Sequence, residues 1–288
     1  MSISRQNLTI VIVTFKSEKV IDKCINSIGQ NVPIIVVENS NNQKFKHDLE
    51  SKYKNLKCIL SGSNLGMGAG NNVGIKAATT DYVLILNPDA TLEPNSLDKL
   101  FLASKKLSEF TILSPINVDL NFPNYKTKEI PKDENTPFQV DYVDGFSMLL
   151  NKNKFNDVIH FDENFFLYLE NNDLCLRVKR AGGSVYIVPT AKINHRGSMT
   201  VDAKYKDEVE LSRNWHWIWS KFYFNKKNFG FSKAIIECLP TYISSILKFL
   251  FYTLINNGFK KKIHLNRASG FYNALIGKSS WYRPKIDN

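Results

Sequence analysis

The residues best suited to chemistry begin with a short polar turn behind an apolar segment. Asn87, Pro88 and Asp89 directly follow the apolar residues 84–86. Two side-chain oxygen donors on a turn that proline stiffens are suited to a hard divalent cation that also binds phosphate oxygens. The alternative is that Asp89 only caps the helix that we expect at residues 94–108.

A second candidate is a carboxylate behind an aromatic run. Residues 165–169 are Phe-Phe-Leu-Tyr-Leu, and Glu170 follows them at the expected start of a helix. Apolar surroundings raise the pKa of a carboxyl group, which suits Glu170 to general-base catalysis. Asp173 lies in the first turn of the same helix, where an acidic side chain can also serve only the helix dipole.

Three other features give weaker signals. Glu38 leaves an apolar strand, where its carboxylate can accept a hydrogen bond from a base or ribose, or simply stabilise a turn. Residues 63–74 are rich in glycine before a helix, which lets backbone amides approach phosphates. However, Asn71 replaces the third glycine of the dinucleotide fingerprint, and no Walker motif is present. His195 ends a strand, and a lone histidine is more often structural than catalytic.

Alternating strands and helices must position these residues. Apolar runs predict strands at 8–14, 33–37, 57–60 and 82–86, and helical spacing predicts helices at 18–28 and 67–78. This order indicates βαβ units and a mainly parallel sheet. In such sheets the loops at the carboxyl ends of the strands carry the function. Residues 117–140 predict a long surface loop that could bind a ligand or act as a lid.

Composition and charge narrow the classes of protein. Hydrophobic residues make up 43% of the 288 residues and charged residues 23%, which excludes disordered, collagen-like and coiled-coil proteins. The four cysteines are far apart, which argues against a zinc site or a disulfide framework and favours a reducing cytosol. No signal peptide is expected at the N-terminus.

The net charge of +11 is concentrated at one end of the chain. Residues 211–288 contain 13 Lys and Arg but only Glu237 and Asp287 as acids, so they account for the whole excess. Such a segment could bind nucleic acid, an anionic membrane or an acidic substrate. Its aromatic residues lie within apolar helices instead of alternating with arginine, which argues against nucleic acid.

Taken together, these features resemble the inverting family 2 glycosyltransferases with the GT-A fold, in particular the bacterial rhamnosyltransferase-like members. The resemblance covers residues 8–197. The segments that carry it are Ile12-Val13-Thr14-Phe15, Val37-Glu38-Asn39-Ser40, Asn64-Leu65-Gly66, Asn72-Val73-Gly74, Leu86-Asn87-Pro88-Asp89, Asp144-Gly145, residues 161–166, residues 170–177 and His195.

The resemblance implies the fold and the domain boundaries. We expect an α/β protein with a Rossmann-like GT-A domain, whose mostly parallel sheet is flanked by helices, and a C-terminal helical extension. The GT-A domain is expected at residues 1–203, with a nucleotide-sugar part to about residue 115 and an acceptor part from about residue 116. Residues 204–288 form the basic, aromatic extension.

The resemblance also implies a role for each matched residue. The donor-binding residues are Thr14, Glu18, Glu38, Asn64, Gly66, Asn87 and Asp89. Asn87 replaces the first acid of the family's metal-binding signature, and Asp89 with His195 would hold Mg²⁺ or Mn²⁺. Asp144 and Gly145 border the acceptor, and Glu170 and Asp173 are the catalytic candidates.

One position departs from the family pattern. Relatives usually carry an acid where this chain has Asn171, and an amide cannot accept a proton at physiological pH. Either Glu170 is the base, which we favour, or the protein is a catalytically weak or inactive, membrane-peripheral binding protein that kept the fold.

The expected reaction is metal-dependent transfer of a sugar, with L-rhamnose one candidate, from a dTDP- or UDP-linked donor. The acceptor would be a hydroxyl of a lipid-linked or growing bacterial surface polysaccharide such as O-antigen, and the anomeric carbon would invert. Lysines flank the apolar residues 235–255, which favours peripheral attachment to the anionic inner, cytoplasmic face of the cell membrane. Glu237, Pro240 and Lys248 make this segment a poor spanning helix. Packing against the domain or in a homodimer is the alternative.

Overall fold

The computed structural model describes residues 3–107, 109–128, 133, 135–154, 160–195 and 203–286. Its contacts divide the chain into two compact units. We call residues 1–162 with 171–201 the sheet unit, and residues 163–170 with 202–288 the helical unit. Part of the expected loop at 117–140, residues 129–132 and 134, lies outside the described residues, as does the end of the resemblance at residues 196 and 197.

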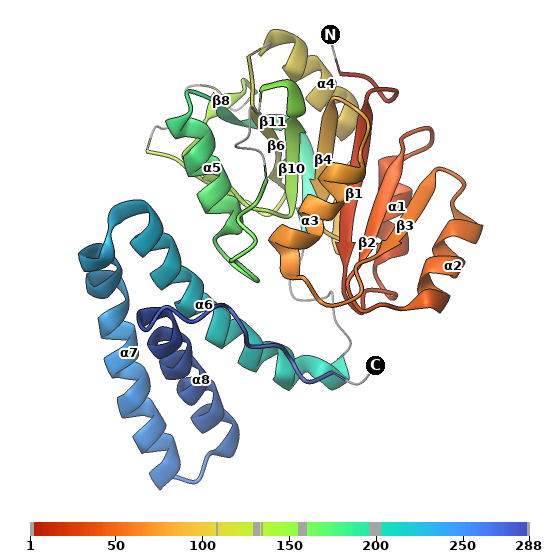
Figure 1. The fold of residues 1–288 in the computed structure, drawn as a ribbon. Helices are drawn as coiled ribbons and strands as arrows, with labels where there is room; N and C mark the ends of the chain where they lie inside the picture. Colours follow the sequence, from red (N-terminus) through yellow and green to blue (C-terminus); the bar gives the residue numbers. More distant parts are fainter. Residues whose placement is uncertain are drawn as a thin grey trace. The chain divides into compact units, whose positions relative to one another are not determined.

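The sheet unit is built on one mixed sheet whose strand order is β3-β2-β1-β4-β10-β6-β11-β5, with β8 paired to β11 (Figure 1). The strands are β1 (Leu8–Thr14), β2 (Ile34–Glu38), β3 (Leu56–Leu60), β4 (Tyr82–Leu86), β5 (Ala90–Leu92), β6 (Ile112–Asn117), β8 (Phe138–Gln139), β10 (Ser147–Asn151) and β11 (Val185–His195). Strands β1 to β4 are parallel to one another, and β10 runs antiparallel to β4. A separate pair joins β7 (Tyr125–Lys126) to β9 (Tyr142–Val143) inside the stretch expected to be a loop and just after it.

Helices cover both faces of the sheet because its central strands are apolar on both sides. On β1, Ile10 and Ile12 pack in one core cluster, and Val11 and Val13 pack in the other. The first cluster includes side chains of α1 (Ile21–Ile28), α2 (Gln43–Lys52) and α4 (Ser96–Lys106). The second includes side chains of α3 (Gly66–Ala77) and α5 (Glu170–Arg180). This alternation of period two is the pattern of a strand buried on both faces.

The glycine-rich run is mostly helical, and its glycines allow α3 to pack closely on β1. A Cβ atom on Gly74 would lie 2.3 Å from Val11 Cγ1, and one on Gly70 would lie 2.9 Å from Val13 Cγ1. Because such separations are far below van der Waals contact, any larger residue would push the helix off the strand. Much of the glycine content therefore serves packing, and only the start of the run belongs to a loop.

The helical unit contains α6 (Lys206–Phe229), α7 (Phe231–Leu254) and α8 (Gly258–Leu275). Its core is aromatic and includes Trp215, Trp219 and Phe222 of α6 with Phe271 of α8. Gly270 permits a close crossing of two helices, since a Cβ there would lie 2.3 Å from the Trp215 carbonyl oxygen.

Residues 163–170 group with these helices instead of with the acceptor part of the predicted GT-A domain. The Ser220 hydroxyl donates a hydrogen bond to the Leu167 carbonyl at 2.7 Å. The Phe166 ring lies 4.6 Å from the His216 ring, and the Arg283 guanidinium lies 3.7 Å above Phe166. Aromatic contacts of this kind are non-local, so the sequence order alone did not indicate this grouping.

Candidate functional site

The polar turn after β4 meets the end of β11 at the carboxyl edge of the sheet. Strand β5 follows the turn and pairs antiparallel with β11, which places His195 opposite Ala90. As a result, His195 Nε2 lies 3.3 Å from Asp89 Oδ1. Only 3% of the Asp89 side chain is exposed, against 20% of the His195 side chain. The structure thus joins the two side chains expected to hold a metal, which lie 106 positions apart in the chain.

An aromatic residue that the sequence reasoning missed holds this histidine. The Phe146 ring stacks on the His195 ring with 4.1 Å between centroids and 19° between planes. The Phe146 carbonyl also accepts a hydrogen bond from the Asn87 backbone amide at 2.9 Å. Phe146 follows the Asp144-Gly145 motif directly, and that position next to a polar motif was the available signal.

Asp144 belongs to the same neighbourhood. Burial raises the pKa of its carboxyl group, and the charge of His195 acts in the opposite direction. Its backbone amide donates to the Asn124 carbonyl at 2.8 Å, which fixes the segment before β10. Asp144 therefore lies close enough to His195 for their charges to interact. That Asp144 and Gly145 border the acceptor stays a prediction.

This donor set is compatible with a divalent cation. Asp89 supplies a carboxylate and His195 an imidazole, while the buried Asn87 Oδ1 has no hydrogen-bond partner among the described residues. Within that same part of the chain, no group of three His, Cys, Asp or Glu side chains could hold a metal ion by itself. Mg²⁺ is commonly bound by one or two carboxylates and by substrate phosphates, and the pair fits that pattern.

Hydrogen bonds through Asn39 join Thr14, at the end of β1, to Asn64 and Gly66 at the start of α3. The backbone amide of Asn39 donates to the Thr14 carbonyl at 2.8 Å. Its side-chain Nδ2 donates to the Gly66 carbonyl at 3.0 Å. Asn64 Oδ1 accepts from the Gly66 backbone amide at 3.1 Å. Asn39 belongs to a segment that carries the family resemblance but was not among the expected binding residues, and it connects Thr14, Asn64 and Gly66.

The Glu38 carboxylate serves its own turn. It is fully buried and accepts hydrogen bonds from the backbone amides of Ser40 (2.8 Å) and Asn42 (2.6 Å), and also from the Ser40 hydroxyl. The exposed Glu18 accepts a hydrogen bond from Asn42 Nδ2 at 3.1 Å. Glu38 thus stabilises a turn, which was the alternative to a role in binding. Contact of Glu38 or Glu18 with a nucleotide stays a prediction.

Glu170 has the properties expected of a general base. It is the first residue of α5, and burial raises the pKa of its carboxyl group to about 7. Its Oε2 atom has no hydrogen-bond partner among the residues that the structure describes. The two preceding residues, Tyr168 (φ 71°) and Leu169 (φ 66°), both adopt left-handed backbone conformations. Each such residue costs about 1–3 kcal/mol and is often found at functional sites.

Asn171 and Asp173 are occupied with structural contacts. Asn171 Nδ2 donates to the Val143 carbonyl at 2.7 Å, and its Cβ lies 3.4 Å from where a Cβ on Gly145 would be. The buried Asp173 accepts a hydrogen bond from Arg177 Nε at 2.8 Å, and Arg177 Nη2 donates to the His160 carbonyl. The amide at position 171 therefore makes a contact that a carboxylate cannot make. A proton-accepting role for Asp173 stays a prediction.

A second amide side chain, not among the expected site residues, anchors the chain ahead of Glu170. Asn72 of α3 exchanges two hydrogen bonds with the Phe161 backbone, from Nδ2 to the carbonyl (2.9 Å) and from the amide to Oδ1 (2.8 Å). The signal was its place in the Asn72-Val73-Gly74 segment.

Comparison with known proteins identifies the family to which this chain is similar. Residues 9–171 match the family model described as "Glycosyl transferase family 2". The chain is 26% identical over 296 residues to "Low-salt glycan biosynthesis hexosyltransferase Agl10" of Haloferax volcanii, across 94% of this chain and 91% of that protein. It is 23% identical to "N-acetylglucosaminyl-diphospho-decaprenol L-rhamnosyltransferase" of Mycobacterium tuberculosis, across 65% of this chain and 75% of that protein.

A solved structure shares the fold. The mannosyltransferase PcManGT from Pyrobaculum calidifontis, in complex with GDP-Man and Mn²⁺, has a TM-score of 0.57 and 12% identity. The match covers 95% of this chain and 88% of that one. The fold prediction, an α/β domain with a mostly parallel sheet and C-terminal helices, is confirmed.

Proposed function

The chain belongs to glycosyl transferase family 2, whose model matches more than half of it, and from this premise we propose that it transfers a sugar from a nucleoside diphosphate donor with inversion. Membership makes it a glycosyltransferase, and its similarity to a named rhamnosyltransferase makes it one of the rhamnosyltransferase-like type. The observation that carries the proposal is the contact between Asp89 and His195 beside Asp144 at the carboxyl edge of the sheet. This is where open α/β sheets bind their ligands.

The donor end of the site is supported by the residues around β1, β2 and β4. Thr14, Asn64 and Gly66 shape the loops at the strand ends, and Asn87 lies beside Asp89. Asp89 and His195 would hold Mg²⁺ or Mn²⁺, which when bound offsets the charge that develops on the departing diphosphate. Phe146 and Asp144 fix the position and the electrostatic surroundings of His195.

Glu170 supplies the base. Its carboxylate removes the proton of the acceptor hydroxyl while the oxygen forms a bond to the anomeric carbon. The bond from that carbon to the diphosphate breaks on the opposite face, and the diphosphate leaves with the electron pair. A single displacement of this kind inverts the configuration. A carboxyl pKa of about 7 suits proton transfer near neutral pH.

The acceptor that we propose is a hydroxyl of a lipid-linked glycan, and rhamnose from a dTDP- or UDP-linked donor is the leading sugar. The relative from M. tuberculosis supports this choice, because its name describes transfer of L-rhamnose to a decaprenyl-linked sugar. The concentration of basic residues in the helical unit supports work at the cytoplasmic face of the cell membrane. A peripheral enzyme of this kind would act in the assembly of a surface polysaccharide.

A product screen tests the proposal. The purified chain is incubated with dTDP-rhamnose, UDP-sugars or GDP-sugars, Mn²⁺ and a short-chain prenyl diphosphate-sugar acceptor in detergent. We expect one donor to give a product larger by one sugar by mass spectrometry, with inverted anomeric configuration by NMR. Donor binding without any product would favour the alternative of an inactive binding protein. Neither binding nor product with any donor would overturn the assignment of the site.

A further inference from the structure

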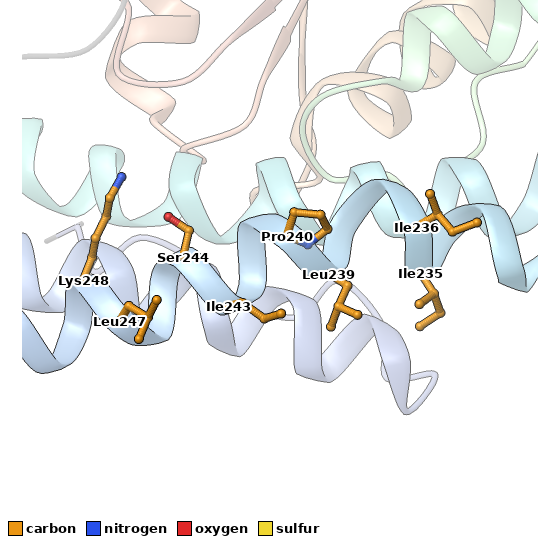
Figure 2. A pocket seen from close by; sticks show the side chains of 8 residues that line it. All are labelled: Ile235, Ile236, Leu239, Pro240, Ile243, Ser244, Leu247 and Lys248. Atoms are coloured by element: carbon orange, nitrogen blue, oxygen red, sulfur yellow. The ribbon is translucent and has the colours of Figure 1, made fainter.

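Helix α7 carries an uncharged apolar stripe that no described residue of the helical unit covers. The stripe consists of Ile236, Leu239, Ile243, Leu247, Leu250 and Leu254. Their spacing of three and four residues places them along one side of a helix. Their exposed fractions run from 38% for Leu239 to 85% for Leu254. Figure 2 shows Leu239, Ile243 and Leu247 along one side of α7, with Lys248 pointing away from them.

The opposite side of α7 is buried within the helical unit. Ala234, Cys238 and Ser245 are buried, and the Tyr242 ring stacks on Phe271 of α8 at 4.7 Å. The stripe is therefore not a core face that is still missing its partner helix.

Glu237, the acid that weakened the apolar character of this segment in the sequence, faces α6. Glu237 Oε1 lies 2.7 Å from Lys233 Nζ, and Oε2 lies 3.3 Å from Lys221 Nζ of α6. Its charge is therefore neutralised away from the stripe. By length and composition α7 is long and apolar enough to cross a membrane, with only 17% of its most apolar window buried.

Lysines and phenylalanines lie at both ends of the stripe. Lys226, Phe229 and Phe231 flank the turn between α6 and α7, and Phe229 and Phe231 are about half exposed. At the other end, Lys260 lies 5.3 Å above the Tyr252 ring and Lys261 lies 5.6 Å above the Phe249 ring. Lysines whose stems run along aromatic rings keep the charge at a polar boundary while burying apolar surface.

From this pattern we infer that the stripe is the surface with which the protein docks on an anionic lipid bilayer, with α7 lying in the plane of the interface. The inference rests on the proposed function and adds to it the surface that meets the membrane. A bilayer supplies both things that this face lacks: an apolar medium for the six aliphatic side chains and anionic headgroups for the lysines at both ends.

A second copy of the chain fits this face less well. Two copies paired through the stripe would place the lysines at one end of α7 against lysines of the other copy, in either orientation of the helices. Among the described residues of α7 and its two flanking turns, Glu237 is the sole acid, and it is already paired with Lys233 and Lys221. Like charges without a partner disfavour such an interface.

A spanning orientation fits less well too. Helices α6 and α8 both pack along α7, so a spanning α7 would draw their charged side chains into the hydrocarbon region. Lys248 lies on α7 itself. An in-plane helix keeps these groups in the headgroup layer.

Vesicle flotation of the full chain tests the inference. The vesicles are phosphatidylcholine alone or with 30% phosphatidylglycerol, at low salt. We expect flotation with the anionic vesicles, release by high salt, and little binding to the neutral ones. Leu247→Glu should weaken binding about tenfold or more, because a charge enters the apolar contact. The matched control is Leu102→Glu on α4 of the sheet unit, where the leucine is similarly exposed (59% against 62%), and it should bind as the wild type does. Replacing Lys260, Lys261 and Lys262 by Gln should weaken binding on the order of 100-fold, at about fivefold per lysine.

Two outcomes would overturn the inference. One is that Leu247→Glu floats like the wild type. The other is that the wild type is a dimer by sedimentation velocity, which Leu247→Glu dissociates, while neither binds vesicles. Transfer to the detergent-dispersed short-chain acceptor separates this inference from the proposed function. If transfer persists and vesicle binding is absent, the docking surface is wrong; if vesicle binding persists without transfer from any donor, the proposed function is wrong.

Discussion

Asn171→Asp, which restores the acid that relatives usually carry, should make this protein less stable without making it faster. The wild-type amide is 8% exposed and donates to the Val143 carbonyl at 2.7 Å. A carboxylate at this position would place one acceptor against another. Losing the hydrogen bond and leaving the buried carbonyl unpaired costs about 1–3 kcal/mol. For a unit of this size, each kcal/mol lowers Tm by about 2–4 °C, so we expect a drop of about 2–12 °C at pH 8.

The loss of Tm in Asn171→Asp should depend on pH. Burial raises the pKa of the introduced carboxyl group, and its protonated form can donate to the Val143 carbonyl again. The loss of Tm should therefore shrink at pH 5. Asn172→Asp is the matched control, since it adds the same charge one residue later at a half-exposed site in the first turn of α5. Its Tm should stay close to that of the wild type. If Asn171→Asp has unchanged Tm and transfers sugar ten times faster or more, Asn171 is a damaged catalytic position and our account of its contacts is wrong.

Three other perturbations have defined outcomes. Asp89→Ala should abolish divalent-dependent donor binding by calorimetry while leaving Tm nearly unchanged, and His195→Ala should weaken it less; metal-independent transfer by the first variant would refute the site. Gly74→Ala should cost about 1–3 kcal/mol by overpacking, whereas Gly258→Ala, with no described atom within 4 Å of the added carbon, should be neutral; equal melting curves would contradict the packing. Burial lowers the pKa of His216 to about 4 from an ordinary value near 6.5. The contribution of neutral His216 to the stability of the fold is therefore full above pH 6.5 and decreases as the pH falls. The free energy of unfolding, measured with denaturant, should fall by about 2 kcal/mol between pH 7 and pH 5. If the free energy of unfolding of His216→Gln falls with pH as steeply as that of the wild type, this prediction is wrong.

The order of strands and helices along the first part of the chain could be predicted because its signals are local. The apolar run 82–86 coincides with β4, and the helix expected at 67–78 differs from α3 by one residue at each end. Strand β6 gave no clear signal because Pro115 interrupts it, and only Phe45 and Leu49 of the polar helix α2 are buried. Such elements are held by tertiary contacts that no local window contains.

The site was predictable in its residue types but not in its contacts. Sequence spacing singles out Asn87 and Asp89, yet the 3.3 Å contact with His195 depends on the register of β5 against β11. The stacking of Phe146 on His195 likewise joins segments far apart in the chain.

The glycine-rich run shows the same limit, because the sequence cannot tell whether a phosphate or a neighbouring strand requires the missing Cβ. In α3, a neighbouring strand, β1, requires it at Gly70 and Gly74. Position 171 is similar: the sequence shows that Asn cannot be a base, and only the fold shows what its amide does instead.

The central claim, that this chain is an inverting transferase with Glu170 as its base, is tested most directly by the pH–rate profile of sugar transfer in the wild type and in Glu170→Gln. The wild-type rate should rise with pH through about 7, because the buried carboxyl group must lose its proton before it can accept one. Glu170→Gln should lower kcat by about 10²–10⁴-fold, leave donor affinity nearly unchanged and remove that rise. A variant within threefold of the wild type with the rise intact, or a large loss in Asp173→Asn instead, would contradict the account.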